Sequence, residues 1–124
     1  MTPAEHHVAV LGATPKPGRY ANQAVQLLKE MGYQTTPIHP KFSEIEGLPV
    51  TQSLAQIQQA VDTLTLYVGP ARLINMIDEV VALKPGRVIF NPGTESRELQ
   101  QALSNASIDW FEACTLVMLK TDTF

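Results

Sequence analysis

Glycine, hydroxyl-bearing and basic residues occur together in one short segment near the start of the chain. Residues 12–20 read GATPKPGRY and follow the apolar run HVAVL. Thr14 offers a hydroxyl, Lys16 and Arg19 offer positive charge, and Gly18 lets a ligand approach the backbone closely. A helix that starts directly after this loop would point its first N–H groups and its dipole at an anion. The segment therefore predicts a phosphate-binding loop.

This loop differs from the two common nucleotide-binding loops. The pattern GxGxxG would need glycine two and five residues after Gly12, where the chain has Thr14 and Pro17. No Gly-Lys-Ser or Gly-Lys-Thr triplet follows, so the Walker A pattern is absent as well. The loop predicts a phosphate ligand without deciding which nucleotide carries it.

The end of the second predicted strand, at residues 34–38, narrows the choice of ligand. NAD sites place an acidic residue there to bind the adenosine ribose. In this chain the strand is followed by His39-Pro40-Lys41, and the first acidic residue, Glu44, lies beyond it. A lysine at this position favours a phosphorylated ribose. Both a 3′-phosphate, as in coenzyme A, and a 2′-phosphate, as in NADP, satisfy this condition.

The elements that must position these residues follow from the spacing of apolar side chains. Five strands are predicted, at residues 7–11, 34–38, 63–68, 87–90 and 108–111, with a shorter one at 48–51. Helices are predicted at residues 19–31, at 54–60, from Pro70 to before Pro85, around Leu99, Ala102 and Leu103, and at 115–120. Pro37 cannot donate to a ladder, which predicts either an edge position for its strand or a strand end.

Strands that alternate with helices in this way predict an α/β fold. The expected architecture is a three-layer domain with a parallel sheet of about five strands. Ligands of such sheets bind at the carboxyl ends of the strands, near the point where the strand order reverses. Besides residues 12–20 and 39–41, this edge is expected to hold Gly69-Pro70, Asn91–Glu95 and Glu112–Cys114.

Short motifs along nearly the whole chain resemble the small single-domain proteins of the CoA-binding family. The matching segments are VAVLGATPKPGRYANQAV, GYQTTPIHPK, EIEGLPVTQSL, VIFNPGTES and EACTLVML. That family has a Rossmann-like fold similar to the CoA-binding domain of the succinyl-CoA synthetase α subunit. Two positions depart from its usual pattern. His39 stands where asparagine is common, and Gly69-Pro70 replaces a more polar segment that often contains arginine.

The resemblance implies a course for the ligand along the sheet edge. Gly12, Ala13 and Thr14 would lie against the CoA pyrophosphate, and Arg19 and Tyr20 would close the loop. The adenosine and its phosphorylated ribose would lie by Pro40 and Lys41. The full set of expected cofactor-binding residues is Gly12, Ala13, Thr14, Pro17, Gly18, Arg19, Tyr20, His39, Pro40, Lys41, Val68, Gly69, Pro70, Asn91, Pro92 and Gly93.

No constellation of residues predicts catalysis. His6 and His7 precede the first strand, at the far end from the expected site, and are predicted to be surface residues and not metal ligands. His39 has no acidic or nucleophilic partner in the sequence, which favours a packing or hydrogen-bonding role. Cys114 precedes a predicted helix, whose dipole would favour the thiolate. Its apolar surroundings, EACTLVML, predict a buried side chain instead.

Composition limits the remaining classes of function. The 124 residues are enough for one domain, residues 1–124, and the net charge of −3 disfavours nucleic acid as the main partner. No apolar run reaches the length of about 18 residues that a membrane span needs, and no signal peptide is recognised. The single cysteine excludes an internal disulfide, and we expect a cytoplasmic protein.

The prediction is a non-catalytic module that binds coenzyme A or an acyl-CoA. An NADP-dependent oxidoreductase or another nucleotide-binding protein is the alternative, disfavoured by the missing GxGxxG and the lack of a substrate domain. A structural or interaction protein with a vestigial cleft is a third candidate. Action as a homo-oligomer or with a partner enzyme stays open.

Overall fold

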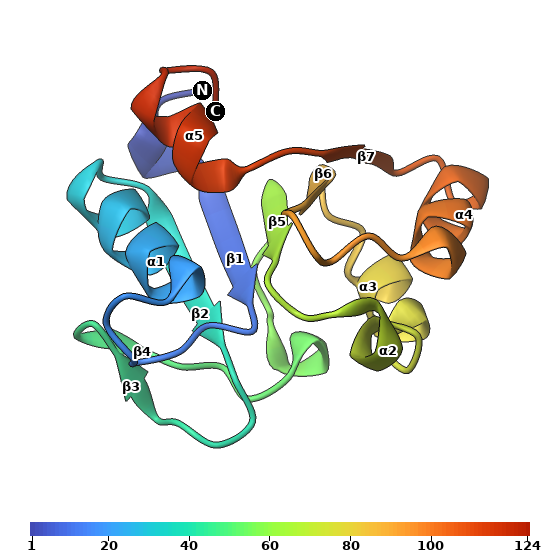
Figure 1. Cartoon of the computed structure of the whole chain (residues 1–124), viewed down its shortest axis with the longest axis horizontal. Helices are drawn as coiled ribbons and strands as arrows, with labels where there is room; N and C mark the ends of the chain where they lie inside the picture. The colour runs from blue at the N-terminus through green and yellow to red at the C-terminus, as the bar shows by residue number, and fades with distance from the viewer.

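A five-stranded parallel sheet forms the centre of the computed structural model, which describes all 124 residues (Figure 1). Its strand order is β2-β1-β5-β6-β7. The strands are β1 His7–Leu11, β2 Gln34–Ile38, β5 Thr63–Leu66, β6 Arg87–Phe90 and β7 Asp109–Glu112. The predicted α/β class and the parallel sheet of five strands are confirmed. β2 lies at one edge of the sheet, as Pro37 indicates.

Helices cover both faces of the sheet and make it the middle of three layers. The helices are α1 Tyr20–Glu30, α2 Pro70–Leu73, α3 Ile77–Leu83, α4 Arg97–Asn105 and α5 Thr115–Lys120, with 3-10 turns at Pro3–Glu5 and Leu54–Gln56. In Figure 1, α1 and α5 lie together on one side and α2, α3 and α4 on the other. No helix combines the length and the apolar character needed to cross a bilayer.

Successive side chains of the central strands point to opposite faces of the sheet and pack into two separate apolar cores. Val8 and Val10 of β1 pack with Val25 and Leu28 of α1 in one core, and Leu119 of α5 joins them. The neighbouring strand residues Ala9 and Leu11 belong to a larger core on the opposite face, with side chains of α2, α3 and α4. Because both faces are buried, β1 is apolar from Val8 to Leu11 instead of alternating with polar residues.

The strand order reverses between β1 and β5, and the chain needs a glycine at that point. Gly12, directly after β1, has a φ of +87°. A Cβ on Gly12 would lie 2.8 Å from both the Tyr67 carbonyl oxygen and Val68 Cγ2. Only glycine fits this conformation and this approach of two backbones. Open α/β sheets bind their ligands at such a point.

Two predicted helices are altered. The helix predicted from Pro70 to before Pro85 is divided into α2 and α3. At the break, the N–H groups of Asn75 and Met76 bond three residues back instead of four, which tightens the turn and bends the axis. The helix predicted at residues 54–60 is one 3-10 turn, because Ser53 makes no side-chain cap and the backbone is extended again at Ile57.

The segment after β2 forms a small hairpin instead of a lone strand. β3 Glu44–Ile45 pairs antiparallel with β4 Leu48–Pro49, and a parallel bridge joins Thr51 to Ile38. The prediction had only a strand at residues 48–51. The hairpin returns the chain to the carboxyl end of β2, next to the residues that follow that strand.

The two adjacent histidines are not surface residues, so that prediction is wrong. His7 is only 4% exposed, and its ring nitrogens bond the Ala60 carbonyl (2.8 Å) and the Thr36 hydroxyl (2.7 Å). His6 is half-buried and bonds the Thr63 hydroxyl at 2.7 Å. Both satisfy polar groups of neighbouring strands at the amino edge of the sheet.

Candidate functional site

A groove with three hollows runs along the carboxyl edge of the sheet, and Tyr67 lines all three. The β1–β2 pocket is lined by Leu11, Gly12, Thr14, Ile38, His39, Pro40, Gln52, Ser53, Leu54, Tyr67, Val68, Arg72, Met76 and Glu79. The loop pocket is lined by Gly12, Thr14, Lys16, Arg19, Tyr20, Ala21 and Tyr67. The α1–α5 chamber is lined by Tyr20, Gln23, Tyr67, Asn91, Pro92, Cys114, Leu116, Val117 and Lys120.

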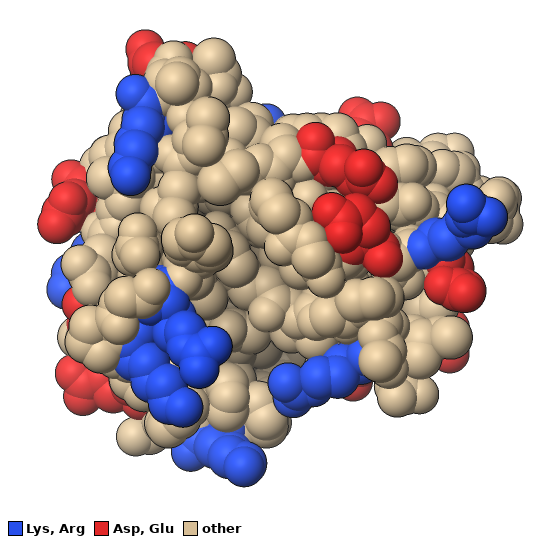
Figure 2. All heavy atoms as spheres, viewed as in Figure 1, with Lys and Arg blue, Asp and Glu red and all other residues tan.

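Charge is unevenly distributed around this groove. Figure 2 shows basic side chains over the loops that follow β1 and β2 and over α2, around a hollow in the surface. Acidic side chains gather over the segments that follow β6 and β7. Although the net charge of the chain is −3, its basic residues thus form a local site large enough for a small anion.

The loop pocket lies at a helix N-terminus that the chain itself does not satisfy. The first backbone bond of α1 is donated by Gln23 to the Arg19 carbonyl (3.0 Å), and Tyr20, Ala21 and Asn22 donate no backbone N–H bond. The N-cap residue Arg19 makes no side-chain cap, and the first turn holds no acidic residue. Free N–H groups and the positive end of the helix dipole thus face a pocket that Lys16 and Arg19 also line.

The two residues after β1 have a different role from Thr14. The N–H groups of Gly12 and Ala13 both donate to the Ile38 carbonyl, at 3.1 and 3.2 Å, and Ala13 is fully buried. These bonds join the loop to the end of β2. The Thr14 hydroxyl accepts the N–H of Lys16 at 3.3 Å, which leaves its own proton free to donate. Thr14 and the start of α1 thus hold the loop's free donors.

A buried asparagine holds this loop against α1. Asn22 Nδ2 donates to the Thr14 carbonyl (2.9 Å) and to the Glu46 carboxylate (3.2 Å). Gln26 Nε2 donates to Asn22 Oδ1 at 2.6 Å. Asn22 was not among the residues expected at the site. Its signal was a polar residue beside the apolar positions Ala21, Ala24 and Val25 in the helix.

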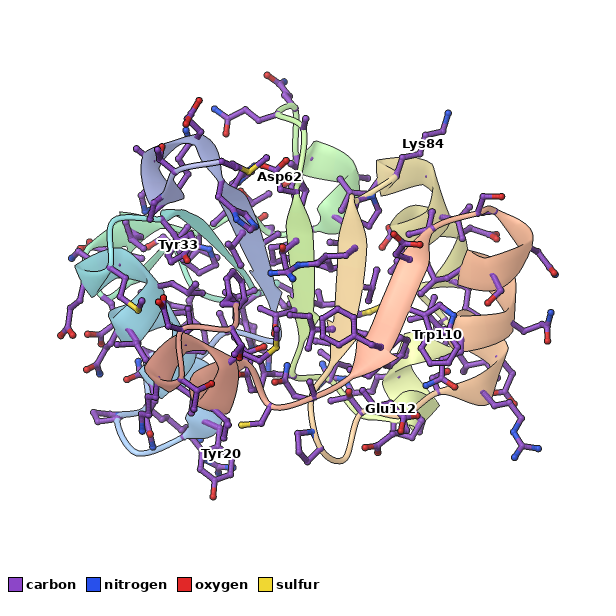
Figure 3. All side chains as sticks on the ribbon, turned by 90° about the horizontal axis from the view of Figure 1, so that it is seen from above. Tyr20, Tyr33, Asp62, Lys84, Trp110 and Glu112 are labelled. Atoms are coloured by element: carbon purple, nitrogen blue, oxygen red, sulfur yellow. The ribbon has the colours of Figure 1, made fainter.

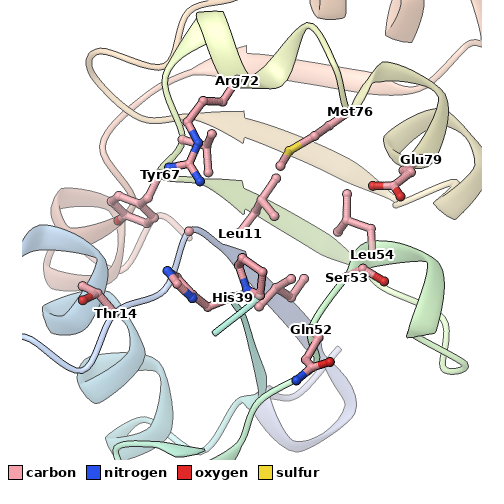
Figure 4. Close-up of a pocket in the computed structure, with 14 residues that line it drawn as sticks. Leu11, Thr14, His39, Gln52, Ser53, Leu54, Tyr67, Arg72, Met76 and Glu79 are labelled. Carbon is pink, nitrogen blue, oxygen red and sulfur yellow. The ribbon is translucent and has the colours of Figure 1, made fainter. Parts of the chain in front are cut away.

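The β1–β2 pocket contains donors and acceptors on opposing walls, as the close-up shows (Figure 4). His39 Nδ1 accepts the N–H of Lys41 at 3.0 Å, so the ring proton lies on Nε2, which can donate to a ligand. Burial lowers the pKa of His39, and the nearby charges of Arg72 and Lys41 lower it further. The imidazole is therefore neutral near pH 7, consistent with the hydrogen-bonding role predicted for it.

Arg72 and Glu79 are the charged residues of this pocket, and neither was among the residues expected at the site. The guanidinium of Arg72 points into the pocket, and the Glu79 carboxylate faces it from α3 (Figure 4). Arg72 donates no side-chain hydrogen bond within the chain, whereas Arg87 at the other edge of the sheet donates two. The signal for Arg72 was its position in the first turn of a helix starting at the ligand edge.

The expected residues around this pocket divide into lining and supporting positions. Pro40 and Val68 line it, and Lys41 is exposed just beyond Pro40 without lining it. Gly69 is the N-cap of α2 and Pro70 its first residue, so they position Arg72 without lining the pocket. Pro17 and Gly18 lie exposed in the loop after β1, outside the lining of all three hollows.

Asn91 positions the floor of the α1–α5 chamber. Its Nδ2 donates to Thr65 Oγ1 (2.7 Å) and to the Leu66 carbonyl (2.8 Å), and its Oδ1 accepts the N–H of Thr115 (2.8 Å). Nearly all of its hydrogen-bonding capacity is thus used within the protein. Pro92 lines the chamber. Gly93 does not, and its N–H donates to the Glu95 carboxylate at 3.0 Å.

Tyr67 lines both the chamber and the loop pocket, and Cys114 lines the chamber. The phenol oxygen of Tyr67 is buried without a hydrogen-bond partner. Burial raises the pKa of Tyr67 to about 12, and the nearby Cys114 thiol contributes in the same direction. The Thr115 and Thr65 hydroxyls lower this pKa in part, although neither forms a hydrogen bond with the phenol oxygen. Cys114 is the N-cap of α5, in agreement with its predicted position before that helix, but it is half-buried instead of buried, and it lines the chamber.

The chain is similar to known proteins over most of its length. The family model described as "CoA binding domain" matches residues 6–120. An acetate–CoA ligase (ADP-forming) of Archaeoglobus fulgidus is 31% identical over 97 residues, which cover 77% of this chain and 14% of the enzyme. The YneT protein of Bacillus subtilis is 24% identical over 72 residues, covering 58% of this chain and 53% of YneT. The chain thus spans only part of these relatives.

Solved structures have the same fold. A crystal structure of an uncharacterized protein superposes with a TM-score of 0.90 at 40% identity, covering 96% of this chain and 98% of the other. The cell-free ID.343 protein of Thermus thermophilus gives 0.88 at 32% identity, covering 96% and 90%. The family match includes the loops after β1, β2, β5 and β6 that build the groove. On that match, the chain belongs to the CoA-binding domain family.

Proposed function

We propose that the groove binds coenzyme A or an acyl-CoA and that the chain acts as a binding or regulatory module without catalysis of its own. The observation that carries this proposal is the loop pocket. It combines a free helix N-terminus with Thr14, Lys16 and Arg19, the donor set that a pyrophosphate requires. It lies between a pocket on one side and an open chamber on the other, so a ligand with a central pyrophosphate fits the groove.

The β1–β2 pocket suits the adenosine end of such a ligand. Leu11, Ile38 and Val68 give it apolar walls for a base, and His39 Nε2 offers a donor for the ribose or its phosphate. Arg72 lines the pocket and Lys41 lies just beyond Pro40, so both bring positive charge close to His39. We therefore propose that a 3′-phosphate lies between these two residues, and that Arg72 replaces the charge that the Gly69-Pro70 departure removes.

The similarity to these relatives supports CoA as the ligand but does not support a reaction catalysed by this chain alone. The enzyme from Archaeoglobus is named as a ligase of acetate and CoA, and this chain matches 14% of its length. We therefore propose that the chain provides the CoA-binding part of such chemistry, and that any turnover depends on a partner enzyme.

Isothermal titration of the full chain with CoA, dephospho-CoA and NADP tests the proposal. We expect CoA to bind most tightly, with dephospho-CoA weaker by about tenfold because it lacks a phosphate held by charged donors. Lys41→Met should weaken CoA and leave dephospho-CoA nearly unchanged. The matched control is Lys84→Met, at the opposite edge of the sheet from Tyr20 (Figure 3).

Three results would contradict parts of this proposal. Tighter binding of NADP than of CoA would favour the nucleotide-dependent oxidoreductase. Equal loss of both CoA forms in Lys41→Met would remove that lysine from 3′-phosphate recognition. Absence of binding by all three ligands would leave the groove without a nucleotide role.

A further inference from the structure

The α1–α5 chamber is an open cavity of about 450 Å³, larger than the β1–β2 pocket of about 190 Å³. It shares Tyr20 and Tyr67 with the loop pocket, so a chain that leaves a phosphate there can follow the sheet edge into it. In Figure 3, Tyr20 lies beside α5 at this end of the sheet. If CoA binds as proposed above, on which this inference rests, its thiol end enters this chamber.

The chamber wall is apolar where solvent-facing residues would normally be polar. Tyr20 is 72% exposed and Val117 is 56% exposed, two of the few large apolar side chains left on the surface. Pro92 and the buried Leu116 continue the wall. A ligand that covers this surface would remove apolar area from water and would bind more tightly as a result. A pantetheine arm that ends in a bare thiol would cover only a small part of it.

Lys120 is the only charged group of the chamber. No carboxylate lines the cavity, and Lys120 donates no side-chain hydrogen bond in the chain. The bonds from Asn91 to Thr65 and Thr115 fix the floor and the start of α5, so the cavity is formed before a ligand arrives. An apolar wall with one cation at its rim fits an acyl chain that ends in a carboxylate.

We propose that this chamber holds the acyl group of a short-chain acyl thioester, and that Lys120 selects acyl groups that carry a distal carboxylate. Tyr20, Pro92 and Val117 contact the methylene groups. The ligand class is therefore an acyl-CoA of a short dicarboxylic acid, in preference to free CoA.

The test compares three ligands that differ only from the end of the pantetheine arm onward: desulfo-CoA, which lacks the terminal sulfur, valeryl-CoA and glutaryl-CoA. Titration of the full chain should show valeryl-CoA binding about tenfold more tightly than desulfo-CoA, from the buried methylene groups. Glutaryl-CoA should bind about threefold more tightly than valeryl-CoA, as one partly exposed ion pair allows. Lys120→Met should abolish the second difference, and Lys84→Met should leave it intact.

Cys114 gives a second measurement at the chamber itself, because it is the only cysteine of the chain. We expect saturating valeryl-CoA or glutaryl-CoA to slow its alkylation by iodoacetamide about tenfold or more, and desulfo-CoA to slow it less. Equal affinities and equal protection with all three ligands would overturn the inference and leave CoA binding standing. Failure of all three to bind would overturn both proposals.

Discussion

Polar groups at the amino edge of the sheet are hydrogen-bonded within the chain, whereas several at the carboxyl edge have no partner. At the amino edge both ring nitrogens of His7 are bonded within the chain, and Arg87 donates to Thr63 Oγ1 (2.8 Å) and to the Phe124 carbonyl (3.2 Å). The Arg87 guanidinium also lies 4.6 Å from the centre of the Phe124 ring. At the carboxyl edge the first N–H groups of α1 and the guanidinium of Arg72 have no partner.

This difference separates structural polar residues from candidate ligand-binding ones. Groups that are buried and satisfied stabilise the fold, because removing one partner leaves another unsatisfied. Exposed donors that converge on a groove without partners contribute little to stability and are available to a ligand. Substitutions at the amino edge should therefore lower the free energy of unfolding, and those at the carboxyl edge should lower affinity.

The largest expected effect is at the amino edge. His7→Ala creates a cavity and leaves the Ala60 carbonyl and the Thr36 hydroxyl unpaired, so it should lower the free energy of unfolding by about 3 kcal/mol. Urea titration followed by circular dichroism measures this. Asp109→Asn, an exposed residue at the start of β7, is the control. A loss below about 0.5 kcal/mol would show that the buried bonds of His7 are dispensable.

A double change in the loop pocket should separate binding from stability. Lys16→Ser with Arg19→Ser should weaken CoA about 100-fold, from two lost charge-assisted contacts, while the melting temperature stays nearly constant. The matched control is Lys84→Ser with Arg97→Ser, which removes the same charge elsewhere. If the control pair weakens CoA equally, the effect is one of net charge and the loop is not the phosphate site.

A single change in the β1–β2 pocket should have a smaller effect. Arg72→Met keeps the length of the side chain and removes its charge, so CoA should bind about tenfold more weakly and dephospho-CoA should lose less. Calorimetry on both ligands measures the difference, with Arg97→Met on α4 as control. An unchanged affinity for CoA would place the ribose phosphate away from Arg72.

The smallest expected effect is a pH dependence of stability. Burial lowers the pKa of His6, and the Arg87 charge adds to it, while burial and the Arg72 charge lower that of His39. Because the unfolded chain binds protons more tightly at these sites, they favour folding above pH 6.5, and this contribution is lost as the pH falls below that value. Thermal unfolding between pH 7.5 and 5 should show the decline. His6→Asn should reduce it, and an identical decline in that variant would exclude His6.

The sequence predicted the elements that depend on local pattern. The five strands follow from short apolar runs, and the start and end of α5 agree with the prediction at residues 115–120. The helix predicted from Pro70 was wrong in its middle, because Leu73, Ile77 and Val80 keep helical spacing across a break at Asn75-Met76. Apolar periodicity cannot detect a tightened turn that preserves the same buried face.

The candidate site was predicted where its residues lie within one loop and missed where they converge from several. Thr14, Arg19 and Tyr20 line the loop pocket, as expected, and His39 and Pro40 line the neighbouring pocket. Tyr67, Arg72 and Lys120 were not identified, since each is an ordinary strand or helix residue in the sequence.

The sequence by itself determined that parallel strands would bring a glycine loop and His39-Pro40-Lys41 to one edge, because side-chain period and strand direction are local properties. Only the tertiary structure decided which donors stay free. In the folded chain the N–H groups of Gly12 and Ala13 donate to the Ile38 carbonyl, whereas those at the start of α1 have no acceptor. It also joins α1 to α5 around a chamber. Such choices depend on contacts between residues far apart in the chain, which no local pattern encodes.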